Sequence, residues 1–157
     1  MMNIENNAHH IIQDLKDEMV ALGLDLEMPH QSMKALDTVY TEVIYGKMIS
    51  ATFKFNPAFC NPFRRIQGGF ICAFIDDVCG PLTFMAAKRP CATLDLNTTF
   101  LRPFDSKDEY VNVKAELISK SKSLIVLKAQ VTSKDEKLIA IATSVSMILS
   151  DEQSLGR

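Results

Sequence analysis

The chain has 157 residues, of which 47% are apolar and 23% are charged, and its formal net charge is −2. This length suits a single domain that buries its own core, and the charge balance lacks the basic excess of a nucleic-acid-binding protein. Because the apolar stretches are too short to span a membrane and the amino terminus lacks the pattern of a signal peptide, we expect a cytoplasmic protein that contacts no membrane.

The amino-terminal part of the chain predicts one amphipathic helix, over residues 8–22. Its apolar residues recur every three to four positions. Asn6 or Asn7 can cap its start, and Gly23 can end it in the left-handed conformation. The mixed segment 24–37 that follows predicts a linker.

A strand pair and a loop are predicted next. Residues 39–45 and 47–55 are rich in β-branched and aromatic residues, and Gly46 between them suits a turn or a bulge. Residues 56–67 contain two Asn-Pro steps, which are typical of a loop.

Residues 68–88 are apolar almost all the way round, which indicates a helix that is buried on most sides. Pro81 lies inside this segment and cannot donate a hydrogen bond to the carbonyl of Asp77, so we expect a kink or a break there. Because the helix has too much apolar surface for a flat face, the sheet must wrap around it.

Four further strands with alternating polarity and short polar turns complete the pattern. They cover residues 92–101, 110–118, 123–132 and 137–149. One long central helix among antiparallel strands predicts an α+β fold. We divide the chain into an N-terminal helical extension (1–35), a main domain (36–150) and a C-terminal tail (151–157).

The cysteines and histidines limit the chemistry that the chain can carry. The four cysteines form no C-x-x-C pair, so we expect free thiols in a reducing compartment. All three histidines stand within the first thirty residues, which disfavours a Ser-His-Asp, Cys-His or histidine-rich metal site. These residues are Cys60, Cys72, Cys79, Cys91, His9, His10 and His30.

Two features of the central segment indicate a site. Gly68 and Gly69 stand where the buried helix should begin, and free N–H groups at a helix start attract a carbonyl or an anion, although a glycine pair also simply allows a turn. Asp76 lies in the most apolar helix, where an unpartnered carboxylate is costly, so it is a candidate for a shifted pKa and a functional role. Asp77 points about 100° away, toward water at the edge of the sheet. Both aspartates can alternatively form a plain polar edge of the helix.

Helix geometry links these features to an oligomer. Asp76 follows Gly68 by eight residues, which is roughly 12 Å along a helix axis. A general base and the donors that polarise its substrate must meet within a few ångströms of the reacting atom. Two antiparallel helices in a symmetric dimer bring Asp76 of one chain to Gly68 of the other, so a site of this kind implies a dimer with two sites at its interface.

A longer motif runs through the same region. Asn61, the turn Gln67-Gly68-Gly69, Asp76 and the strand segment 93–103 (TLDLNTTFLRP) follow one another in order. This order resembles the hotdog-fold acyl-CoA thioesterases of the 4-hydroxybenzoyl-CoA or phenylacetate-pathway type, and the resemblance covers residues 36–150. It implies an antiparallel sheet wrapped around one long central helix, with the N-terminal helix as an addition.

The resemblance also implies roles for single residues. Asp76 matches the family's catalytic acid, which acts as general base on water or as nucleophile on the thioester carbon. Gly68 supplies the backbone N–H that polarises the thioester carbonyl, and Asn61 of the opposite chain orients the water or the substrate. Thr93 falls where a small hydroxyl helps to hold the water. Gln67 departs from the family's usual His: its amide donates a hydrogen bond but cannot give a proton.

The implied substrate is an acyl-CoA, so CoA enters as part of the substrate and we expect neither a separate cofactor nor a metal. Its phosphates favour basic side chains near the interface, although each such side chain can equally be a solvated surface charge. The candidate substrate-binding residues are Gly69, Arg64, Arg65, Lys88, Arg89, Lys120 and Lys122. We expect a homodimer, with a dimer of dimers left open.

Two other functions compete with thioester hydrolysis. Dehydratases and hydratases share the architecture but usually need a histidine beside the acid, and no histidine follows His30. A non-catalytic acyl-CoA-binding or sensing protein would keep the pocket without needing Asp76 as a base. The pairing of Asn61 with Asp76 favours the enzyme.

Overall fold

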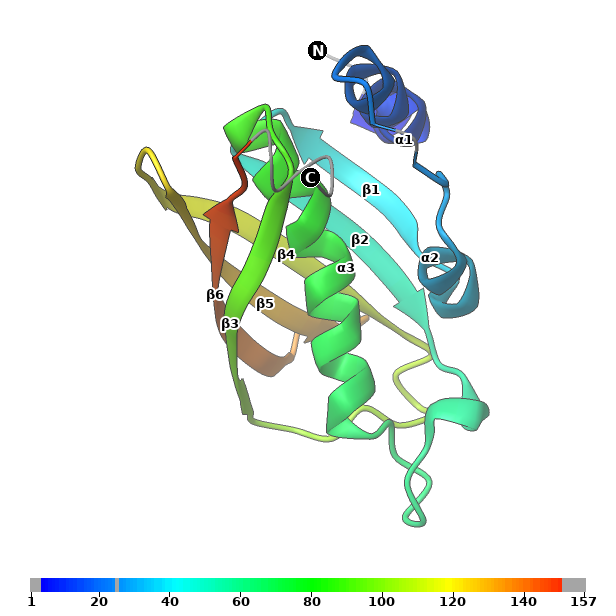
Figure 1. The fold of residues 1–157 in the computed structure, drawn as a ribbon. Helices are drawn as coiled ribbons and strands as arrows, with labels where there is room; N and C mark the ends of the chain where they lie inside the picture. The colour runs from blue at the N-terminus through cyan, green and yellow to red at the C-terminus, as the bar shows by residue number, and fades with distance from the viewer. Residues whose placement is uncertain (1–3, 25, 151–157) are drawn as a thin grey trace.

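The structure is a computed structural model that describes residues 4–24 and 26–150; the predicted tail, 151–157, lies outside the described residues. Its elements are shown in Figure 1. In chain order they are α1 (Ile4–Ala21), α2 (Gln31–Leu36), β1 (Val39–Ile44), β2 (Met48–Lys54), the 3-10 turn η1 (Pro57–Phe59), α3 (Gly68–Ala87), β3 (Cys91–Phe100), β4 (Tyr110–Lys120), β5 (Leu124–Ser133) and β6 (Leu138–Ile148).

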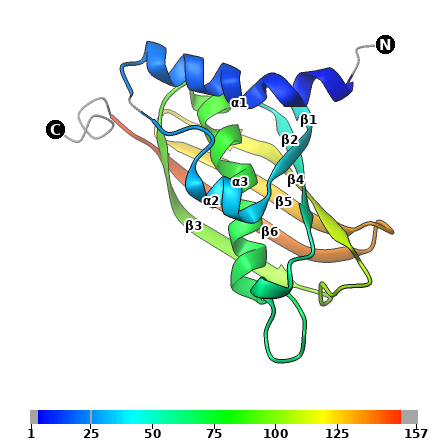
Figure 2. The same cartoon turned by 90° about the vertical axis from the view of Figure 1, so that its right-hand side faces the viewer.

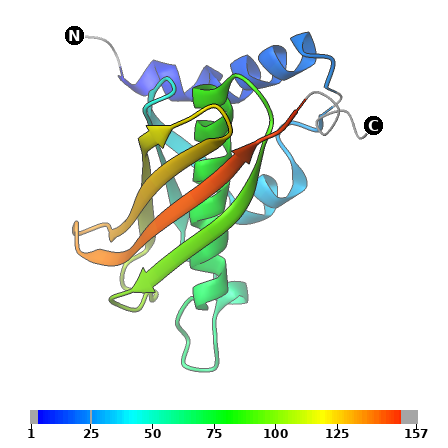
Figure 3. The ribbon, with the colours of Figure 1, turned by 60° about the vertical axis from the view of Figure 1, so that its left-hand side comes forward.

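The six strands form one antiparallel sheet in the order β1-β2-β4-β5-β6-β3. The sheet curves around α3, so that β3 passes alongside the helix (Figures 1 and 3). Phe74, Ile75 and Val78 on the inner side of α3 are fully buried against it. The expected α+β architecture, with a sheet wrapped around one long helix, is therefore confirmed.

Among the described residues, α3 is the one helix long and apolar enough to cross a membrane by length and composition. Half of its apolar window is buried inside the fold, as in the core helix of a folded domain.

The N-terminal extension packs onto the same core. α1 lies against β1 and crosses near the end of α3 (Figure 2), and Ile11 and Leu15 join the buried cluster. Gly23 ends the helix with a φ of 78°, as predicted, because glycine adopts the left-handed conformation without steric cost. The predicted caps were wrong: the helix begins at Ile4, so Asn6 and Asn7 lie inside it.

The segment predicted as a linker contains the short helix α2, which lies beside α3 (Figure 2). Met33 and Leu36 of α2 are buried, which explains why six residues without a strong helical pattern are helical. Tertiary packing supplies the stability that the local sequence lacks. The linker prediction was therefore wrong for this part of the segment.

Pro81 neither breaks α3 nor ends it, since the helix runs without interruption from Gly68 to Ala87. Proline has no N–H, so the carbonyl of Asp77 loses its partner within the helix. The hydroxyl of Tyr40 on β1 donates to this carbonyl at 3.0 Å. A buried tyrosine thus satisfies the acceptor that proline leaves free, and the expected break does not occur.

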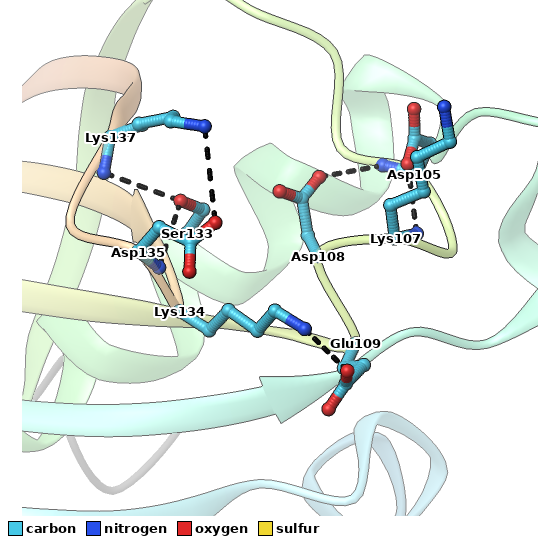
Figure 4. Close-up of polar contacts among 8 residues, drawn as sticks. All are labelled: Asp105, Lys107, Asp108, Glu109, Ser133, Lys134, Asp135 and Lys137. Carbon is cyan, nitrogen blue, oxygen red and sulfur yellow. Dashed lines mark hydrogen bonds and ion pairs between the residues drawn. The ribbon is translucent and has the colours of Figure 1, made fainter.

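Two exposed turns meet at the β5–β6 end of the sheet (Figure 4). Ser133 Oγ accepts hydrogen bonds from the backbone N–H groups of Asp135 and Lys137, both at 3.3 Å. Lys134 forms an ion pair with Glu109 in the turn before β4. These local contacts close the hairpin, and they lie outside the cavities described below.

Candidate active site at the central helix

Asp76 lies in the middle of α3 and faces β3. The hydroxyl of Thr93 on β3 donates to its carboxylate at 3.1 Å. The side chain is exposed in the single chain, so the expectation of apolar surroundings was wrong. The apolar residues of α3 turn toward the sheet, and position 76 falls on the open side of the helix.

A β-bulge aims Thr93 at Asp76. β3 pairs with β6 through Thr93 opposite Ser146 and Asp95 opposite Val145, so Leu94 is an extra residue in the strand. After the bulge it is the even-numbered Thr98 that faces α3, where it contacts Cys72 at 3.6 Å. Without the extra residue, side-chain alternation would turn Thr93 away from the helix.

Asp77, rather than Asp76, is the buried carboxylate. Its side chain is 5% exposed, and Thr38 Oγ1 donates to it at 2.6 Å while His30 Nε2 lies 3.5 Å away. Burial raises the pKa of Asp77 above its ordinary value, and the Thr38 hydrogen bond and His30 oppose this shift. The expectation that Asp77 meets water was wrong because α2 covers this side of α3.

His30 connects α2 to α3. Its Nδ1 accepts a hydrogen bond from the backbone N–H of Met33 at 3.2 Å and thereby caps α2. A nitrogen that accepts from a backbone N–H carries no proton, so the proton of the neutral ring lies on Nε2, which faces Asp77.

The same hydrogen bond of His30 argues against Ser32 as a nucleophile. Ser32 Oγ lies 2.7 Å from His30 Nδ1. That nitrogen is already the acceptor for the helix cap, so it is poorly placed to take a proton from Ser32 as a general base would. The contacts among Ser32, His30 and Asp77 therefore cap α2 and do not form a catalytic triad.

A cavity of about 340 Å³ opens between α2 and α3 beside these groups. Asp76 and Asp77 of α3 line it, together with His30, Ser32 and Leu36 of α2. The exposed carboxylate therefore opens onto a space whose other wall is the N-terminal extension. Sequence reasoning did not single out His30 or Ser32, because the contact with α3 depends on the tertiary fold.

A second cavity, of about 370 Å³, lies at the start of α3. Gly68, Asn61 and Arg65 line it, and so does Arg102, which sequence reasoning also missed. The Phe70 N–H already donates to the carbonyl of the N-cap residue Gln67 at 2.9 Å, so the N–H groups of Gly68 and Gly69 before it are the ones available to a ligand. A Cβ atom at Gly68 would lie 3.0 Å from the ring of Phe100, which restricts this position to glycine unless the ring moves.

Asn61 and Gln67 present different groups near this cavity. The side-chain oxygen of Asn61 accepts from the backbone N–H groups of Phe63 and Arg65, at 2.9 and 3.3 Å. Its amide nitrogen is therefore the group that can bind a substrate. Gln67 is the exposed N-cap of α3, and its side chain makes no capping hydrogen bond.

The basic candidates divide between the two ends of α3. Arg64 and Arg65 lie in the loop that leads into the helix, with Gly69 in its first turn. Lys88 caps the other end, where its Nζ pairs with Glu18 at 3.1 Å. Lys120 donates to the carbonyl of Ala86 near that end, at 2.7 Å. The remaining two candidates, Arg89 and Lys122, stand in loops after α3 and after β4.

One chain brings Thr93 to Asp76 but leaves Gly68 and Asn61 in the other cavity.

All four cysteines are free, and burial raises the pKa of Cys79 to about 12, which leaves its thiol unreactive at neutral pH. In residues 4–24 and 26–150, no group of three or more His, Cys, Asp or Glu side chains could hold a metal ion.

The curled sheet, the central helix with its glycine start and the mid-helix carboxylate define a domain of the hotdog class. Residues 65–140 match the sequence model of the thioesterase superfamily. This match and the solved structures described next confirm the family expected from the sequence.

Three solved structures illustrate the likeness. The PaaI protein of the phenylacetic acid degradation operon of E. coli has a TM-score of 0.74 and 14% identity, over 89% of this chain and 96% of that one. A phenylacetic acid degradation-related protein of Ralstonia eutropha has a TM-score of 0.70 and 27% identity, over 83% and 98%. A thioesterase of Haemophilus influenzae has a TM-score of 0.69 and 18% identity, over 76% and 82%. No curated protein sequence matches the chain.

Proposed function

We propose that the protein is an acyl-CoA thioesterase, with Asp76 as general base or nucleophile and the Gly68 N–H of the partner chain as the group that polarises the carbonyl. The observation that carries this proposal is the placement of Asp76. Its carboxylate is exposed on the open side of α3, is held by Thr93 and opens onto a cavity. The match of residues 65–140 to the thioesterase superfamily supports thioester hydrolysis as the reaction type.

The edge strand β3 supports a homodimer. β3 pairs with β6 on one side only, and Leu94 and Phe100 are 58% and 49% exposed. A ten-residue edge strand with exposed apolar side chains is a template for pairing with another strand. Antiparallel pairing of β3 with its copy would place the two α3 helices antiparallel, as the separation of Asp76 from Gly68 requires. A dimer of dimers stays open.

The proposed reaction follows from these positions. Asp76 takes a proton from water, and the resulting hydroxide attacks the thioester carbon while the partner's Gly68 N–H stabilises the oxyanion. The intermediate then expels the CoA thiolate, which takes the proton back from Asp76. The products are the free acid and CoA. If Asp76 attacks directly, the C–S bond breaks and the CoA thiolate leaves as a mixed anhydride forms on Asp76. Water then hydrolyses the anhydride to the free acid and the Asp76 carboxylate, and the proton that this step releases goes to the thiolate.

The other candidates support binding and orientation. The amide of Asn61 orients the water or the carbonyl, and Gln67 donates a hydrogen bond where the family's His would stand. Arg64, Arg65 and Arg102 lie near the glycine turn, where their guanidinium groups suit the phosphates of CoA. In an antiparallel dimer, four basic residues of the chain that supplies Asp76 suit the same role: Lys88, Arg89, Lys120 and Lys122. The proposal requires no separate cofactor.

Thiol release from a panel of acyl-CoA esters tests the proposal. We expect turnover by the native protein and its loss in Asp76→Asn, which keeps the size of the side chain but removes the base. Asp135→Asn is the matched control, because it makes the same change in an exposed turn (Figure 4). Saturable acyl-CoA binding without any thiol release would instead identify a binding protein, and equal rates for Asp76→Asn and the native protein would exclude Asp76 as the base.

A further inference from the structure

The two cavities along α3 differ in charge. The cavity at the glycine turn is lined by Arg65 and Arg102, whereas the cavity between α2 and α3 is lined by Asp76 and Asp77. A CoA ester is itself asymmetric, because its phosphates lie on one side of the thioester and its acyl group on the other. Charge complementarity therefore directs the CoA part to the arginine-lined cavity and the acyl part to the carboxylate-lined cavity.

Carboxylates outnumber basic groups in the α2–α3 cavity. Two carboxylates face one imidazole and the hydroxyl of Ser32. Nδ1 of His30 accepts the capping hydrogen bond of α2, so Nε2 is the nitrogen that faces Asp77. Asp77 is 5% exposed, so water screens its charge only weakly.

The cavity also offers apolar surface to an acyl group. Its volume is about 340 Å³. Leu36, Gly80 and Pro81 give it apolar wall beside the carboxylates.

We infer, on the basis of the proposed thioesterase function, that the α2–α3 cavity is the acyl subsite and that it selects acyl groups without a negative charge. An acyl group that ends in a carboxylate meets two like charges at close range, which costs free energy that a neutral group of the same length does not lose. The N-terminal extension thereby takes part in substrate selection, with Asp77 as a specificity-determining residue.

Butyryl-CoA and succinyl-CoA provide a matched pair, since both acyl groups have four carbons and one ends in a carboxylate. We expect kcat/KM for succinyl-CoA to be lower by about tenfold or more. Calorimetric binding of two non-hydrolysable thioethers, S-butyl-CoA and S-(3-carboxypropyl)-CoA, reports the same selection without turnover. Equal or tighter binding of the carboxylate form would overturn the inference, whereas tighter binding of the neutral form with no thiol release would contradict the hydrolase proposal alone.

Two variants assign the selection to this cavity. Ser32→Lys adds a positive charge to the cavity wall, and we expect it to bring the succinyl-to-butyryl ratio closer to one, as Asp77→Asn should do by removing a negative charge. Ala35→Lys and Asp37→Asn are the matched controls, because both positions are exposed on or next to α2 and do not line the cavity. If the control variants shift the ratio as far as the cavity variants, overall charge causes the selection and the assigned subsite is wrong.

Discussion

Asp76 and Asp77 are neighbours in the chain, yet the open and the covered side of α3 give them opposite surroundings. Asp76 is exposed and accepts a hydrogen bond from Thr93, whereas Asp77 is 5% exposed and contacts Thr38 and His30. A carboxylate on the open side can meet water and a substrate. A carboxylate on the covered side instead holds the N-terminal extension against the helix. We therefore expect Asp76 to govern the rate of turnover and Asp77 to govern the stability of the protein and the selection of the acyl group.

The largest expected effect is on the turnover number. Removing a general base typically lowers the rate by about 10² to 10⁴, so Asp76→Asn should lower kcat for butyryl-CoA by that factor. Asp77→Asn should keep kcat within about tenfold of the native value, because it removes no group from the reacting atoms. Steady-state thiol release measures kcat for both variants. If kcat falls as far in Asp77→Asn as in Asp76→Asn, the open and covered sides of α3 do not differ in their role in turnover.

The covered side predicts a loss of stability when Tyr40 loses its hydroxyl. Tyr40 is 7% exposed and donates to the Asp77 carbonyl that Pro81 leaves free. Tyr40→Phe leaves a buried acceptor without a partner, which should lower the free energy of unfolding by about 1–3 kcal/mol. Tyr45→Phe is the control, since Tyr45 is 42% exposed and water can replace its hydrogen bonds with Glu18 and Lys88, so this variant should cost about 0.5 kcal/mol in urea unfolding. Equal midpoints for the two variants would show that the carbonyl finds another donor.

The open side predicts a smaller effect at Thr93. Thr93→Val removes the donor to Asp76, and the loss of one charge-assisted hydrogen bond should lower kcat by about tenfold. Thr93→Ser keeps the hydroxyl and should restore most of the rate. Thr143→Val, at an exposed position of the neighbouring strand β6, should leave kcat unchanged. A defect in Thr93→Ser equal to that in Thr93→Val would point to packing rather than hydrogen bonding.

The pH dependence of stability gives the smallest effect. Burial raises the pKa of Asp77, so the folded protein binds this proton more tightly than the unfolded chain does. The stabilisation is fully present below the ordinary aspartate pKa of about 3.9 and is lost as the pH rises through the raised pKa. We expect the unfolding free energy of the native protein, relative to Asp77→Asn, to fall across this window in urea titrations at a series of pH values. A difference that grows with pH would mean that the carboxylate is stabilised in the fold.

Much of the fold could be predicted because its signals are local. The strands alternate in polarity, Gly23 and Gly46 adopt positive φ where the chain turns, and residues 68–87 are apolar almost all the way round. Local signals do not say which side of a helix another segment will cover, and this is where the predicted surroundings of Asp76 and Asp77 were wrong.

The candidate site was predictable only in part, for the same reason. The spacing of Asn61, Gly68 and Asp76 is visible in the sequence, and the structure places the first two in one cavity and the third in another. The bulge at Leu94 and the contact of His30 with Asp77 depend on strand register and on the packing of α2. Neither the bulge nor this contact produces a recognisable pattern in the sequence of its own segment.

The central claim is that each site combines Asp76 of one chain with Asn61 and Gly68 of the other, and subunit mixing tests it most directly. Asp76→Asn and Asn61→Asp homodimers should both be inactive; the second variant keeps the oxygen that accepts from Phe63 and Arg65. After unfolding together and refolding at equal amounts, half of the dimers are mixed and each mixed dimer holds one complete site. We therefore predict a return to about a quarter of the native activity. Activity that stays at the level of the separate variants would contradict a site shared across the dimer.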